Sequence, residues 1–127
     1  MMRVLVDTSV WIDYFRSGGE TSELDYLIDN NFVFTNDLVL TELVPFLRLQ
    51  HQISIVQVIN EVANLPLSVD WSEIQEFQYT CLKSGINGVG IPDLIIVQNA
   101  KQSESLIFSL DKHFGLMLDV LDFELYL

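Results

Sequence analysis

Short apolar runs alternate with longer amphipathic stretches along the chain, and this alternation constrains the fold more than any other feature. The stretches between the runs place apolar residues at helical spacing. Strands that alternate with helices are typical of a mostly parallel sheet covered on both faces. The expected strands are Arg3–Val6, Phe32–Phe34, Leu65–Val69, Leu106–Phe108 and Phe123–Tyr126. We therefore predict an α/β fold, a three-layer α/β/α sandwich with a mostly parallel central sheet, formed as one domain by residues 1–127.

The expected helices have recognisable start and stop signals. Asn36 is a typical N-cap, Asp70 and Glu73 form a capping box, and Pro92 lies in a first turn, where proline is tolerated. Glycines at positions 18 and 19 should stop the first helix. The predicted helices are Asp7–Phe15, Thr21–Asn30, a helix from Asn36 to about Gln50, a stripe over Ile55–Val62, a helix from Asp70 through Cys81, Ile91–Gln102 and a short helix after Asp111.

Composition limits the classes of function. Six Lys and Arg oppose eighteen Asp and Glu, a formal net charge of −12, whereas a protein that binds nucleic acid through its whole surface is normally basic. The acidic excess instead favours bound metal ions or a basic protein partner. A lone Cys81 and the shortness of every apolar run predict a soluble, cytoplasmic protein.

Two aspartates directly follow predicted strands. Asp7 comes after Val4–Val6, and Asp111 comes after Leu106–Leu110. In open parallel sheets, ligands bind beyond the carboxyl ends of the strands, so both residues are candidates for a functional site. The alternative for each is a simple N-cap of the following helix.

Two further carboxylates lie on predicted helices. Glu42 interrupts an otherwise apolar stripe of Leu38, Phe46 and Leu49, where an unpaired buried charge would be costly. Asp93 shares a helical face with Ile96, Val97 and Ala100. The alternatives are a glutamate that reaches solvent from the stripe edge and an acid favoured by the helix dipole.

Asp7, Glu42, Asp93 and Asp111 all map to one edge of the predicted sheet. Clustered carboxylates repel one another and must be neutralised by protons or cations. Hard oxygen ligands suit Mg²⁺ or Mn²⁺, and magnesium sites commonly use a few carboxylates together with water and substrate phosphates. The cluster therefore predicts metal-assisted hydrolysis of phosphodiester bonds.

Four segments, in this order along the chain, resemble the acidic motifs of PIN-domain nucleases, above all VapC-type toxins. They are Val6–Phe15, Thr41–Leu43, Gly90–Ile96 and Ser109–Phe114. The resemblance implies Mg²⁺ or Mn²⁺ bound by the four carboxylates, cleavage of single-stranded or loop RNA, a cognate antitoxin with a basic tail as partner, and a homodimer. It also places Ser9 and Ser109 at hydroxyl positions that line such sites, with capping or turn bonding as their alternative.

Two other interpretations remain open at this point. One is a catalytically idle PIN-like binding module, which a metal-titrated cleavage assay would distinguish. The other is a response-regulator-like switch, although Asp7 lacks the neighbouring acid that this class uses. His51 and His113 have no cysteine cluster for zinc. We expect His113 to have an ordinary surface or packing role.

Overall fold

The computed structural model describes residues 2–16 and 22–126. The predicted helix stop at residues 17–19 and the predicted helix start at Thr21 lie outside this part of the chain. The elements are β1 (Val4–Val6), α1 (Thr8–Arg16), α2 (Ser22–Asp29), β2 (Val33–Thr35), α3 (Asp37–Leu49), α4 (Ile53–Asn60), β3 (Ala63–Asn64), α5 (Trp71–Lys83), α6 (Ile91–Gln102), β4 (Leu106–Phe108) and α7 (Lys112–Leu118).

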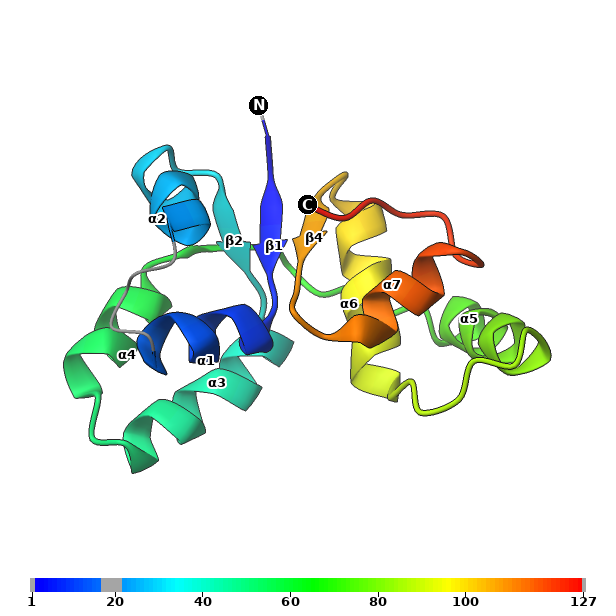
Figure 1. Ribbon diagram of the computed structural model, residues 1–127, viewed down its shortest axis with the longest axis horizontal. Coiled ribbons are helices and arrows are strands. Elements are labelled where there is room, and N and C mark those ends of the chain that lie inside the picture. The colour runs from blue at the N-terminus through cyan, green and yellow to red at the C-terminus, as the bar shows by residue number, and fades with distance from the viewer. Residues whose placement is uncertain (1, 17–21, 127) are drawn as a thin grey trace.

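The four strands form one parallel sheet in the order β3-β2-β1-β4. The chain first winds outward from β1 to β2 and β3, and then crosses back to place β4 on the free side of β1. In Figure 1 helices α1 to α4 lie on one side of the strands, and α5 to α7 lie on the other. The predicted α/β sandwich with a parallel sheet is confirmed, and its strand order reverses between β1 and β4.

The third predicted strand is misplaced. Pairing with β2 involves Ala63 and Asn64, whereas the apolar segment predicted at Leu65–Val69 lies just beyond the strand. The predicted last strand over Phe123–Tyr126 is reduced to a single parallel bridge between Ile107 and Leu125. Both errors concern the edges of the sheet, where apolar content is a weak guide to hydrogen bonding.

The core follows from the alternation seen in the sequence. All three residues of β1 are fully buried, as expected for a central parallel strand with helices on both faces. Helix α6 is buried on the face that carries Ile96, Val97 and Ala100. Among the described residues, no helix has both the length and the apolar content needed to cross a membrane.

Candidate active site

Asp7 lies at the carboxyl end of β1 and is held on both its backbone and its side chain. Its backbone N–H donates to the carbonyl of Phe108, at 2.9 Å, which fixes it beside the end of β4. Its Oδ2 atom accepts hydrogen bonds from the hydroxyls of Ser9 and Ser109, each at 2.8 Å. The side chain is buried, so these donors stabilise its charge where water contributes little.

The same two serines shape the turn after β4. The Ser9 hydroxyl accepts from the backbone N–H of Leu110 at 3.0 Å, and the Ser109 hydroxyl accepts from the N–H of Asp111 at 3.0 Å. The two hydroxyls are also within 3.3 Å of each other. Ser9 and Ser109 therefore connect Asp7 to the segment that carries Asp111, across the point where the strand order reverses.

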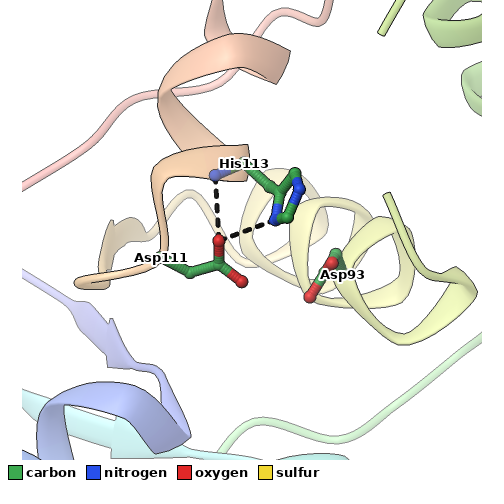
Figure 2. A group of neighbouring side chains, drawn as sticks. All are labelled: Asp93, Asp111 and His113. Carbon is green, nitrogen blue, oxygen red and sulfur yellow. Dashed lines mark hydrogen bonds and ion pairs between the residues drawn. The ribbon is translucent and has the colours of Figure 1, made fainter. Parts of the chain in front are cut away.

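Asp111 is the N-cap of α7, as the capping alternative expected, but its carboxylate also meets another side chain. Its Oδ1 atom accepts from the backbone N–H of His113 at 2.9 Å and lies 2.8 Å from Nδ1 of the His113 ring. Figure 2 shows Asp111 and His113 beside Asp93, which comes from α6. The cap thus positions one carboxylate oxygen between α7 and the site.

Asp93 lies in the first turn of α6, and its Oδ2 atom accepts from the backbone N–H of Gly90 at 3.2 Å. The pKa of this carboxyl is raised, chiefly because burial penalises the charged form, and further by the charges of Asp111 and Asp7. The bond from Gly90 and the proximity of His113 act in the opposite direction. Asp93 is therefore both a helix-start residue and a neighbour of the other acids.

Glu42 is close to the other acids, but the premise that predicted it was wrong. The buried face of α3 is formed by Val39, Leu43 and Leu47, one position away from the predicted stripe. Leu49, which belonged to that stripe, is 78% exposed.

Glu42 as a whole residue is exposed, and its carboxylate accepts a hydrogen bond from the Thr8 hydroxyl at 3.1 Å. Partial burial of the carboxylate is the largest cause of its raised pKa. The bond from Thr8 lowers this pKa, and the charges of Asp7 and Asp93 raise it further. Glu42 thus reaches solvent, as the alternative expected, from a position within electrostatic range of two of the other carboxylates.

Two buried asparagines connect the helices that carry Glu42 and Asp93. Asn36 caps α3 through a hydrogen bond from the N–H of Val39 to its Oδ1 atom, at 2.8 Å. Its Nδ2 atom donates to Oδ1 of Asn99 on α6, at 2.9 Å, and Asn99 donates in turn to the carbonyl of Pro66 at 3.0 Å. Because Asn36 and Asn99 are fully buried or nearly so, these bonds fix the spacing of α3 and α6.

In the described part of the chain, three side chains that could bind one metal ion lie together: Asp93, Asp111 and His113. One potential ligand atom from each lies within 4.8 Å of the others. Asp7 and Glu42 border this group. The sequence predicts only an ordinary surface or packing role for His113. Its place beside Asp111 follows from the Asp-x-His spacing at a helix start, because the capping carboxylate bonds to the N–H two residues on and the side chain at that position lies close to it.

The donor set fits a divalent cation. Carboxylate oxygens are the ligands preferred by Mg²⁺ and Mn²⁺. Burial is the main cause that raises the pKa of Glu42 and Asp93, and a bound cation would relieve both this desolvation of the charge and the repulsion from neighbouring carboxylates that adds to it. The side chains of His113 and Asp111 are 28% and 34% exposed, so an ion can reach them from solvent. The residues that would hold it are Asp93 and Asp111, with Asp7 and Glu42 beside them.

The family model described as PIN domain matches residues 4–117. The comparison with curated proteins gave no match.

Solved structures share the fold at low sequence identity. DNA-bound VapBC from Salmonella typhimurium is similar to this chain with a TM-score of 0.77 and 14% identity, over 99% of this chain and 98% of that one. VapBC2 from Rickettsia felis, bound to a DNA fragment from its promoter, has a TM-score of 0.78 and 15% identity, over 98% of both chains. FitAcB from Neisseria gonorrhoeae has a TM-score of 0.71 and 19% identity, over 95% of this chain and 96% of that one.

Proposed function

Because this chain belongs to the PIN-domain family, we propose that it is a metal-dependent endoribonuclease, and that Asp7, Glu42, Asp93 and Asp111 form its catalytic metal centre. The observation that supports the proposal is the proximity of Asp93 to Asp111, with Asp7 and Glu42 within electrostatic range of Asp93, beyond the carboxyl ends of β1 and β4. Asp7 bonds to both serines there, Asp93 and Asp111 are within 4.8 Å at their ligand atoms, and Glu42 is coupled electrostatically to Asp7 and Asp93.

A Mg²⁺ or Mn²⁺ ion held there would polarise the phosphodiester and lower the pKa of a water molecule. The protein's own residues prepare the site for it. Ser9 and Ser109 orient Asp7, the Gly90 N–H orients Asp93, and the His113 N–H orients Asp111. These fixed donors hold the carboxylates in place before substrate arrives, so little reorganisation is needed during the reaction.

The direct test is cleavage of single-stranded RNA with and without Mg²⁺, Mn²⁺ or a chelator. We expect activity to depend on the metal. We also expect the products to carry 5′-phosphate and 3′-hydroxyl ends, because water attacks phosphorus, the bond from phosphorus to the 3′ oxygen breaks and that oxygen leaves with a proton. Asp7→Asn and Asp93→Asn should each lower the rate about 100-fold or more while circular dichroism shows a folded protein, since even indirect neighbours of a metal contribute about 10–100-fold.

Three outcomes of this assay would contradict the proposal. A 2′,3′-cyclic phosphate product would show that the 2′-hydroxyl of the RNA is the nucleophile. Full activity of both variants would show that Asp7 and Asp93 serve only at the starts of their helices. Tight RNA binding with no metal-dependent cleavage would identify the idle binding module instead.

We also propose that the protein is the toxin of a toxin–antitoxin pair, that it works in the cytoplasm as a homodimer, and that a small basic antitoxin inhibits it. Support comes from the similar structures, which are described as VapBC complexes, and from the net charge of −12, which favours a basic partner. A cavity of about 240 Å³ between α1, α3 and α4 offers such a partner a groove in which apolar side chains (Phe15, Phe46, Leu47 and Ile55) alternate with polar ones (Arg16, Gln50 and Gln52).

A further inference from the structure

We propose that the ring of His113 supplies a nitrogen ligand to the metal centre, so that the site prefers a first-row transition ion such as Mn²⁺ or Co²⁺ to Mg²⁺. This inference rests on the proposed metal centre and goes beyond it, because it names a ligand that is not a carboxylate and the class of ion that this ligand selects.

Nδ1 of His113 and Oδ1 of Asp111 are hydrogen-bonded, and their separation is also short enough for both atoms to bind one ion. The two atoms are 2.8 Å apart. Two donors at right angles around an ion with bonds of about 2.1 Å are separated by about 3 Å. A carboxylate oxygen of Asp93 completes a group whose ligand atoms lie within 4.8 Å of one another. Figure 2 shows these three side chains gathered from α6, α7 and the turn between β4 and α7.

Asp111 does not depend on the imidazole for its orientation. Its Oδ1 atom also accepts from the backbone N–H of His113, at 2.9 Å. The carboxylate therefore stays in place when Nδ1 exchanges its hydrogen bond for a metal bond.

The opposite edge of the His113 ring lies close to the loop before α6. A Cβ atom on Gly88 would lie 3.3 Å from Nε2 of His113, so the loop backbone approaches this edge because residue 88 has no side chain. Gly88 also has a φ of +82°, which favours glycine independently. With Nε2 facing the loop, Nδ1 is the nitrogen that faces Asp111.

An imidazole ligand changes which ions the centre prefers. Mg²⁺ strongly favours oxygen ligands in an octahedral arrangement and retains several waters. Imidazole nitrogen suits the later first-row transition ions, and the affinity of a site that contains it rises from Mn²⁺ to Co²⁺. A centre of carboxylates alone would discriminate weakly between Mg²⁺ and Mn²⁺, whereas a centre with one nitrogen should favour the transition ion.

The test is pulsed electron paramagnetic resonance of Mn²⁺ bound to the wild-type protein, which detects a coordinated ¹⁴N nucleus. The sequence contains two histidines, His51 and His113, so the matched control is His51→Asn. His51 has a φ of +58°, a conformation that asparagine tolerates. We expect the ¹⁴N signal in the wild type and in His51→Asn, and its loss in His113→Gln.

Calorimetric titrations of the same three proteins with Mn²⁺, Co²⁺ and Mg²⁺ supply a second readout. His113→Gln should weaken Mn²⁺ and Co²⁺ binding by about tenfold or more and change Mg²⁺ binding little. Mn²⁺ binding without a ¹⁴N signal in the wild type would overturn the role of His113 and leave the metal centre intact. Failure of the wild type to bind any of these ions would overturn both, and the wild-type measurements hold whether or not His113→Gln folds.

Discussion

At the scale of single residues, the site contains carboxyls that oppose folding when ionised. Burial, followed by neighbouring charges, raises the pKa of both Glu42 and Asp93 above their ordinary values of 4.5 and 3.8. A carboxyl whose pKa is higher in the folded than in the unfolded state binds its proton more tightly when folded. Its contribution to stability is therefore fullest at acid pH and is lost as the pH rises through the folded-state pKa.

Asp93→Asn should consequently raise the melting temperature of the metal-free protein at pH 7, because it removes a charge that the folded state solvates poorly while leaving an oxygen for the Gly90 N–H. The advantage over wild type should shrink as the pH falls towards 4, where Asp93 is increasingly protonated in both states. Thermal unfolding of both proteins in chelator, across this pH range, measures the difference.

The control is Asp13→Asn, which removes one negative charge from an exposed position on α1. This control separates two effects on stability: the removal of a poorly solvated charge at the site, and the lowering of the overall net negative charge. If Asp13→Asn is stabilised as much as Asp93→Asn, with the same pH profile, the effect belongs to the whole surface. If Asp93→Asn is less stable than wild type at pH 7, its helix-start role outweighs the repulsion.

At the scale of elements, the contact between Asn36 and Asn99 determines how α3 faces α6. Asn36→Ala removes the cap of α3 and leaves the buried Oδ1 atom of Asn99 without its donor, while the bond from Asn99 to the Pro66 carbonyl remains. We expect a loss of about 2–4 kcal/mol in the free energy of unfolding, since a lost cap costs about 1 kcal/mol and an unsatisfied buried group costs about 1–3 kcal/mol. Urea unfolding measures it.

Asn30→Ala is the matched control, because Asn30 also donates a side-chain hydrogen bond, to the carbonyl of Tyr26, but from an exposed position. Its cost should stay within about 0.5 kcal/mol. Equal losses in the two variants would show that burial of the Asn36–Asn99 pair adds nothing.

The elements also show where sequence patterns succeed and fail. β1 was predicted well because a central parallel strand is buried on both faces and therefore apolar throughout. β3 was misplaced because both of its residues, Ala63 and Asn64, are exposed at the sheet edge, so no apolar signal marks them. Pro66 cannot donate to a ladder, which is one reason why the apolar segment after Asn64 does not extend the strand.

The same contrast holds for the site. Topology alone predicts that Asp7 and Asp111 meet, because residues that follow parallel strands share one edge of the sheet. Glu42 was selected through an incorrect helical face, and a shift of one residue on a helix is enough to exchange a buried position for an exposed one. The Asp-x-His spacing brings His113 close to Asp111, whereas the approach of the Gly88 loop to the far edge of its ring is tertiary packing that spacing does not encode.

At the scale of the whole molecule, a formal net charge of −12 should govern encounters with charged partners. We expect the association rate with a basic antitoxin to fall about tenfold or more as salt rises from low to physiological levels, because exposed charges are screened beyond roughly 8 Å. Stopped-flow mixing with the co-purified partner, over a series of NaCl concentrations, measures this dependence.

The dissociation rate is the internal control, since long-range attraction acts mainly on association whereas short-range contacts act mainly on dissociation. An association rate that does not change with salt would show that long-range electrostatic attraction does not speed the encounter. If no basic protein co-purifies with this chain, the proposal of an antitoxin partner is wrong. The nuclease proposal would then still be tested by its own cleavage assay.

The reversal of strand order has a consequence for how the protein is made. Ser109 and Asp7, which share a hydrogen bond, are 102 positions apart in the chain. During synthesis β1 is made first, and the edge of β1 that pairs with β4 stays unpaired until β4 has been synthesised. A growing chain that has not reached this segment lacks Asp111 and one of the two hydroxyls that hold Asp7. The proposed centre can therefore assemble only after the segment that carries Ser109 and Asp111 has been synthesised.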